Sequence, residues 1–241
     1  MSDAERLIAE LVTICSRHVY SGSADVVVPE PYAPFVPSEW NRTLIVAESQ
    51  NLAGASPYLT RVVASSPDER IRRLYWEPSI GLGIGPWDDG TIKLAAAAVW
   101  PDSPATTYAL SNAVLWSQRS AEGRNMNPEE ALWGPSRAAW MDLLMALVPE
   151  RIVTIGAIAA RVMEGLSAVP MVRWASASPQ LLSRMAVMFD EADLLGRFPE
   201  VKVALDRHPE WAEKYHRNKV FYACHAVSTT RGSIRRSGRP A

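Results

Sequence analysis

The stretch Thr43-Leu44-Ile45-Val46-Ala47-Glu48-Ser49-Gln50-Asn51 indicates the fold class and the first candidate site. Its apolar run stops at a carboxylate, which small and amide-bearing residues follow. A short apolar run between polar residues predicts a strand that is buried on both faces. Open α/β sheets bind ligands just beyond the carboxyl ends of such strands. Glu48 is therefore a candidate site residue; the alternative is that it begins a solvated loop.

Three later segments, 109–116, 151–155 and 171–175, also have the pattern of buried strands, and helical spacing separates them. Strands that alternate with helices favour a mostly parallel sheet covered on both faces. We therefore predict an α/β fold, a three-layer αβα domain with a central, mostly parallel four-stranded sheet. This single domain covers residues 1–230, and a flexible basic tail follows over 231–241.

Capping signals and prolines place several boundaries. Ser66-Pro67-Asp68-Glu69 has an N-cap serine, a first-turn proline and a capping-box glutamate, which together predict a helix start. Asn127-Pro128-Glu129-Glu130 suggests another capping box. Prolines over 29–37 predict a connection that crosses the surface. The remaining predicted helices are 4–15, 91–99, a long helix from Ser136, 157–166, 200–207 and 209–227.

The bulk composition is that of an ordinary globular protein: 241 residues, 48% hydrophobic, 21% charged and a net charge of −1. No apolar run is long enough to cross a bilayer, and the acidic N-terminus is unlike a signal peptide. Two cysteines, Cys15 and Cys224, suit free thiols in a reducing cytoplasm. The arginines of the tail can lie along phosphates, or the tail can be a disordered end.

Two further segments complete a set of ordered features. Trp87 follows a glycine-rich loop and opens a helix, and Asn112 is the polar residue of the strand Ser111-Asn112-Ala113-Val114. The apolar strand 152–155 then leads through Gly156 into a helix of small residues. Trp87 can be a pocket wall or a core anchor, and Asn112 can be a ligand-binding group or a buried strand asparagine bonded to neighbouring backbone.

In this order, the features resemble the uracil-DNA glycosylase superfamily over about Thr43 to Arg184. In the iron–sulfur branch of that superfamily, the strand equivalent to 43–48 ends Gly-Glu-Ala-Pro-Gly. This chain departs from the family at three points: the first motif lacks its glycines and proline, the cluster cysteines are missing, and no histidine occupies the last motif at Ser176-Ala177-Ser178-Pro179. The resemblance is to a divergent member.

The resemblance implies hydrolysis of the bond between N1 of uracil and C1′ of deoxyribose, on a base flipped out of the DNA. Glu48 would orient the water and oppose the positive sugar, with Asp88 and Asp89 as competing carboxylates or plain helix caps. Asn112 would accept from uracil N3–H and donate to O4, while Trp87 would stack on the base. The charge on uracil O2 would go to the backbone amides of Ser49, Gln50 and Asn51.

The missing histidine leaves the leaving-group donor open. The candidates are Ser176, Ser178 and Arg173, although Ser178 before Pro179 also suits an N-cap. Four arginines are candidates for contacts with phosphates, and the alternative is that they are solvated surface residues. They are Arg119, Arg124, Arg137 and Arg173.

Two functions of different classes follow from the same residues. The first is a monomeric, cytoplasmic DNA glycosylase of base excision repair, which takes uracil-containing DNA as its partner and needs no metal, iron–sulfur cluster or other cofactor. The second is a protein on the same scaffold that binds a nucleobase or damaged DNA without cleaving it. An unrelated doubly wound hydrolase or nucleotide binder is a third reading, but the chain has no Gly-x-Ser-x-Gly elbow and no phosphate-binding lysine loop.

Overall fold

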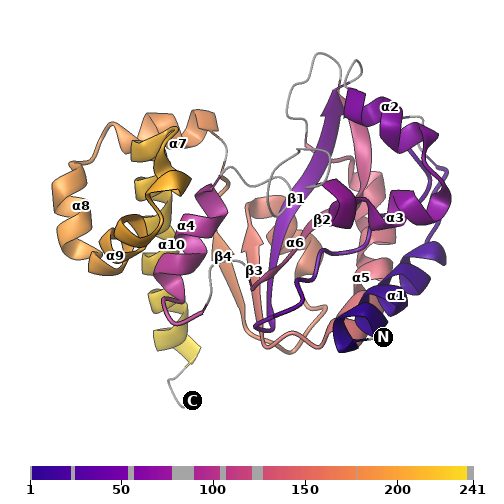
Figure 1. The fold of residues 1–241 in the computed structure, drawn as a ribbon, viewed down its shortest axis with the longest axis horizontal. Helices are drawn as coiled ribbons and strands as arrows, with labels where there is room; N and C mark the ends of the chain where they lie inside the picture. Colours follow the sequence, from indigo (N-terminus) through magenta and orange to yellow (C-terminus); the bar gives the residue numbers. More distant parts are fainter. Residues whose placement is uncertain are drawn as a thin grey trace. The chain divides into compact units, whose positions relative to one another are not determined.

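The protein was analysed as a computed structural model that describes residues 2–22, 25–53, 57–77, 90–103, 107–120, 127–177 and 179–237. Its centre is an all-parallel sheet with the strand order β2-β1-β3-β4, flanked by helices (Figure 1). The strands are β1 (Thr43–Ala53), β2 (Ala109–Ser120), β3 (Arg151–Ile155) and β4 (Met171–Trp174). The predicted α/β, three-layer αβα fold with four strands is confirmed.

The chain divides into two compact units. The single domain over 1–230 remains a prediction. One unit comprises Met1–Pro86 and Tyr108–Met171, and the other comprises Trp87–Thr107 and Val172–Ala241. Each cysteine is free and buried, Cys15 in the first unit and Cys224 in the second. Burial raises the pKa of both thiols to about 12, so neither is an activated nucleophile.

The first unit contains β1, β2 and β3 with the helices that cover them. Strand β1 lies between the other two, pairing with β2 from Leu44 onward and with β3 over Thr43–Val46. Apolar residues of β1 and β2 form the core with α5, whose Trp140, Leu143 and Leu147 are fully buried. The helical elements are α1 (Asp3–Ser16), α2 (Pro57–Ala64), α3 (Pro67–Trp76), η3 (Glu130–Leu132), α5 (Trp133–Leu147) and α6 (Ala157–Met163).

Three predicted helix starts differ in how well the structure matches them. The Ser66 capping box forms as predicted. The Glu69 amide donates to the Ser66 hydroxyl, and the Ser66 amide donates to the Glu69 carboxylate. The box predicted at 127–130 is wrong, because η3 starts at Glu130 without a side-chain cap and the Glu129 amide donates to Gln118. Helix α5 begins at Trp133, three residues before the predicted Ser136.

The proline-rich passage is not the surface connection that we predicted. Tyr32 and Ala33 are fully buried, and the passage runs beside the outer edge of β2. The amides of Val27, Tyr32 and Phe35 donate to β2 carbonyls over 2.8–3.1 Å. Proline lacks an N–H, but the residues between the prolines carry the donors, so the passage can pair with an edge strand.

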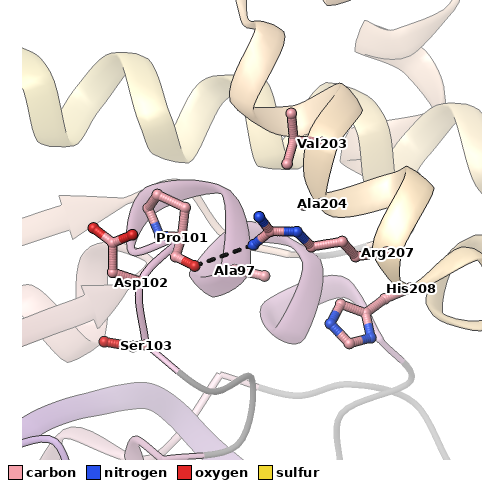
Figure 2. A pocket seen from close by; sticks show the side chains of 8 residues that line it. All are labelled: Ala97, Pro101, Asp102, Ser103, Val203, Ala204, Arg207 and His208. Atoms are coloured by element: carbon pink, nitrogen blue, oxygen red, sulfur yellow. Dashed lines mark hydrogen bonds between the residues drawn. The ribbon is translucent and has the colours of Figure 1, made fainter.

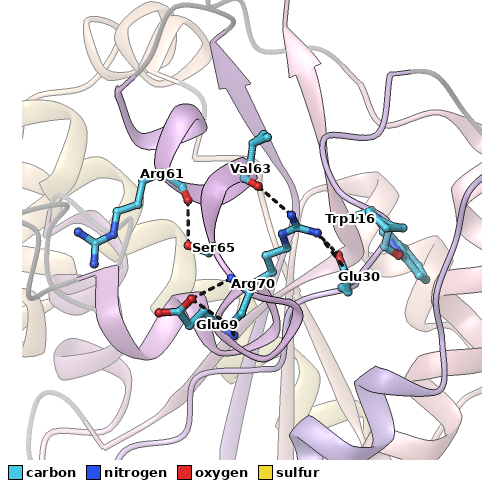
Figure 3. Close-up of polar contacts among 9 residues, drawn as sticks. Glu30, Arg61, Val63, Ser65, Glu69, Arg70 and Trp116 are labelled. Carbon is cyan, nitrogen blue, oxygen red and sulfur yellow. Dashed lines mark hydrogen bonds and ion pairs between the residues drawn. The ribbon is translucent and has the colours of Figure 1, made fainter.

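Helices α2 and α3 are tied to this passage by one arginine (Figure 3). Arg70 donates from Nη1 to the Glu30 carboxylate at 3.2 Å and from Nη2 to the Val63 carbonyl at 2.7 Å. Trp116 of β2 fixes the same passage, since its indole N–H donates to the Pro29 carbonyl. The passage is therefore held from both the helix and the strand.

The second unit consists largely of helices. Helix α4 (Thr91–Val99) is apolar and buried along most of its length, and it packs against α9 and α10. The other helical elements are α7 (Pro179–Ala186), α8 (Glu191–Arg197), α9 (Pro199–Arg207), η4 (Pro209–Ala212) and α10 (His216–Ser237).

The C-terminal prediction needs two corrections. The helix predicted over 209–227 is divided, because Tyr215 adopts a positive φ of 57° between η4 and α10. The predicted flexible tail is helical over 231–237, where α10 continues and Arg231 forms an ion pair with Glu200. No helix within the described ranges is long and apolar enough to cross a membrane.

Candidate functional site

The strand ends differ from those that the sequence suggested. Strand β1 continues five residues beyond Glu48 to Ala53, and β2 continues to Ser120 rather than ending at Trp116. Pairing between β1 and β3, in contrast, stops at Val46 and Thr154. Glu48 therefore lies where β1 has parted from β3 while it still pairs with β2.

This parting point is the topological switch point of the sheet. The chain passes from β1 to β2 on one side and from β3 to β4 on the other side. Open parallel sheets bind ligands in the crevice at the carboxyl ends of the two strands where the order reverses. Glu48, from β1, and Gly156, directly after β3, occupy this place.

The Glu48 carboxylate is held by backbone. Its Oε1 accepts a hydrogen bond from the Ile158 amide over 3.2 Å. Gly156 gives it room, because a Cβ on that residue would meet Oε1 and lie 2.6 Å from Cδ. The side chain remains partly exposed. A fixed, partly exposed carboxylate can orient a water molecule or oppose a positive charge.

Asn112 has a different environment. It is 3% exposed, and its Nδ2 donates to the Tyr32 hydroxyl over 2.7 Å. The hydroxyl of Tyr32 in turn donates to the Val114 carbonyl over 3.2 Å. The Arg73 guanidinium lies 4.1 Å from the centroid of the Tyr32 ring. Burial raises the pKa of Tyr32, so this hydroxyl keeps its proton.

The structure does not bring Glu48 and Asn112 to one face of the sheet. Asn112 pairs with Ala47, and residues paired across neighbouring strands point to the same face. Glu48 follows Ala47 and so points to the opposite face. The two residues are one register position apart along neighbouring strands, but their side chains leave the sheet in opposite directions.

The residues after Glu48 continue the strand instead of forming a turn. Ser49 pairs with Val114, and Asn51 pairs with Gln118 after an irregularity in the register. Residues 49–51 therefore belong to β1 and do not form a turn, while the role of their backbone amides toward uracil O2 remains a prediction. The side chains of Gln50 and Asn51 lie outside the described part of the chain, as do Trp87, Asp88, Asp89, Arg124 and Ser178.

The predicted arginines have separate roles. Arg137 donates from Nη1 to the carbonyls of Val162 and Glu164, so it ties α5 to the end of α6 instead of facing a phosphate. Arg119 and Arg173 have exposed side chains. The phosphate contacts assigned to these two arginines remain predictions.

Ser176 follows β4 in the second unit and is partly exposed. The residue before it, Ala175, is held on both backbone groups by α10. Its amide donates to His225 Nε2 over 3.2 Å, and its carbonyl accepts from the Tyr222 hydroxyl over 3.1 Å. Burial lowers the pKa of His225, which favours the neutral ring that this contact requires.

The second unit also has a surface pocket of about 220 Å³ between α4 and α9 (Figure 2). Asp102, Ser103, Arg207 and His208 supply its polar groups, and Arg207 donates to the Pro101 carbonyl over 3.3 Å. None of the predicted site residues lines this pocket. Its mixture of a carboxylate, a cation and an imidazole selects no single ligand class.

Sequence reasoning missed three residues around the candidate site. Tyr32 lies in the proline-rich passage, where no periodic pattern marks a buried residue, and Arg73 is a fully buried charge on a helix. Gly156 had a signal, since it directly follows an apolar strand. Its φ of 89° shows why glycine is present there.

Among the residues that the structure describes, no group of three or more histidine, cysteine, aspartate or glutamate side chains is placed to hold a metal ion. Neither the comparison with protein-family models nor the search of curated proteins finds a match for this chain. Functional inference therefore rests on the geometry and on the resemblance carried by the motifs.

Proposed function

We propose that the chain hydrolyses the N-glycosidic bond of uracil in DNA and that Glu48 is the carboxylate that directs the water. The observation that carries this proposal is the position of Glu48 at the switch point between β1 and β3, with its carboxylate fixed by the Ile158 amide. The uracil substrate comes from the resemblance of the ordered motifs. The proposal includes action as a monomer in the cytoplasm, on flipped-out bases.

In this reaction, the bond between C1′ and N1 breaks and its electron pair leaves with uracil. The deoxyribose becomes positive at C1′, and the negative Glu48 carboxylate stabilises that charge. Water then adds its oxygen to C1′ and gives up a proton, for which Glu48 is the acceptor. The products are uracil and an abasic site in the DNA.

Base recognition is assigned to Asn112 within this proposal. Uracil offers N3–H as a donor and O4 as an acceptor, and a carboxamide can pair with both. Asn112 is 3% exposed and points to the face of the sheet opposite Glu48, so reading of the base by Asn112 requires the backbone of β1 or β2 to rearrange when the substrate binds. A hydrogen-bonding site of this kind rejects bases that leave its buried groups unpaired.

The test is incubation with single- and double-stranded oligonucleotides that contain one uracil, followed by alkali, which breaks the strand at abasic sites. We expect breaks at uracil and none in a matched thymine oligonucleotide. Glu48→Ala is expected to lower the rate by about 10²–10⁴-fold. Glu150→Ala is the matched control, because that exposed glutamate precedes β3 at the opposite end of the strand. No breaks from the wild type across salt and pH would refute the proposal.

A second candidate function is binding of a nucleobase or damaged DNA without cleavage. The last motif at 176–179 favours it, because no histidine is present there to donate to the leaving base. Tight binding of uracil-containing DNA without any abasic product would select this function over hydrolysis.

A further inference from the structure

Asn112 belongs to a chain of buried contacts that starts on α3. Arg73 is fully buried and donates from Nη2 to the Ser117 hydroxyl over 2.6 Å. Its guanidinium stacks on the ring of Tyr32, whose amide donates to the Leu115 carbonyl over 3.1 Å. Tyr32 is thus fixed by its ring, its backbone and its hydroxyl, and that hydroxyl contacts Asn112.

The donors and acceptors in this chain define which way the Asn112 carboxamide faces. The Val114 carbonyl can only accept, so it takes the single proton of the Tyr32 hydroxyl. The Tyr32 oxygen is then an acceptor toward Asn112. Only Nδ2 of Asn112 can supply that donor, so Oδ1 faces away from Tyr32.

The direction of a carboxamide decides which pyrimidine it can read. Uracil requires a protein acceptor opposite its N3–H and a protein donor opposite its O4. Cytosine needs a donor at N3 and an acceptor at its amino group. A 180° turn of the amide exchanges these two patterns, so a freely turning asparagine serves both bases. Discrimination requires an asparagine whose amide cannot turn.

We propose that Tyr32, held by Arg73, is a positioning residue that locks the Asn112 carboxamide in the direction that selects pyrimidines with an N3–H donor and a 4-keto acceptor. This proposal rests on the base-reading role given to Asn112 above. The lock rejects cytosine. It does not reject thymine, which has the same N3–H and O4, so exclusion of thymine falls to other residues.

The test is equilibrium binding of oligonucleotides that carry 2′-fluoro-deoxyuridine or 2′-fluoro-deoxycytidine, since the fluorine slows glycosidic cleavage. Tyr32→Phe removes the hydroxyl and frees the amide. Tyr75→Phe is the matched control: its hydroxyl also holds the proline-rich passage, through Pro34 and Val36, but it makes no hydrogen bond to Asn112. Binding is measured apart from abasic-product formation, so failure of the lock and failure of the glycosylase proposal are separate results.

We expect the wild type to bind the uracil oligonucleotide more tightly than the cytosine oligonucleotide. Tyr32→Phe should reduce the ratio of these two affinities about tenfold, which corresponds to the loss of one neutral hydrogen bond at its upper strength. Tyr75→Phe is expected to leave the ratio unchanged. Equal binding of both bases by the wild type, or an unchanged ratio in folded Tyr32→Phe, would overturn the proposal.

A second measurement applies if Tyr32→Phe does not fold. The side-chain amide protons of Asn112, assigned by their loss in Asn112→Ala, should include one in the wild type that is strongly protected from solvent exchange, because Nδ2 donates it to the Tyr32 hydroxyl. Side-chain amide protons of Asn112 that both exchange with solvent as fast as those of exposed asparagines would overturn the lock.

Discussion

Gly156→Ala tests whether the Glu48 carboxylate depends on the glycine beside it. Gly156 has φ 89° and ψ 176°, a region that glycine alone occupies readily. An alanine there costs about 1–3 kcal/mol in backbone strain. Its Cβ would also lie 2.6 Å from Cδ of Glu48, so the carboxylate has to leave the Ile158 amide.

The two contributions can be separated in a double-mutant cycle. Glu48→Ala removes the clashing side chain but leaves the backbone strain of Gly156→Ala in place. We therefore expect Gly156→Ala to cost less in the Glu48→Ala background than in the wild type, with a coupling of about 0.5–3 kcal/mol. Urea denaturation of the four proteins gives the free energies of unfolding.

Gly196→Ala is the control, because Gly196 lies in α8 with nothing within 4 Å of its added Cβ, and it is expected to be neutral or slightly stabilising. In the excision assay, folded Gly156→Ala should lose activity as Glu48→Ala does. Wild-type stability of Gly156→Ala, or equal penalties in both backgrounds, would refute the role of Gly156 in holding the carboxylate.

Other predictions concern stability. Glu30→Gln should lower the free energy of unfolding by about 1–3 kcal/mol in urea, because Arg70 keeps its charge without the paired carboxylate. Because burial lowers the pKa of His225 from 6.5, the unfolded chain takes up its proton first. Stability should therefore fall as pH drops below 6.5 and level off below the folded pKa, and His225→Gln should flatten this slope. Trp140→Ala should cost about 3–5 kcal/mol, since the side chain is fully buried, whereas exposed Met141→Ala should stay within about 0.5 kcal/mol by thermal unfolding.

Local sequence determined much of the sheet. The apolar segments that begin at residues 43, 109 and 151 form strands covered on both faces. Each strand begins at the residue where its apolar segment begins. The proline-rich passage was misread because pairing with β2 depends on a distant strand edge. The division of the C-terminal helix depends on the backbone of Tyr215, which no composition signal marks.

The candidate site was predictable in part. Glu48 could be found from its place after an apolar run, which is a local property. Its relation to Asn112 depends on the register between β1 and β2, and a shift of one residue reverses the face of every side chain. The sequence pattern within one strand does not show which residues of two strands pair. The contact of Asn112 with Tyr32 joins residues 80 positions apart, so it also lies beyond local reasoning.

The most direct test of the central claim is a crystal of the protein soaked with uracil. The account predicts uracil bound within hydrogen-bonding distance of Asn112, with the Glu48 carboxylate still on the Ile158 amide. Uracil bound only in the pocket of Arg207 and His208, or bound with Asn112 still enclosed and untouched, would contradict it.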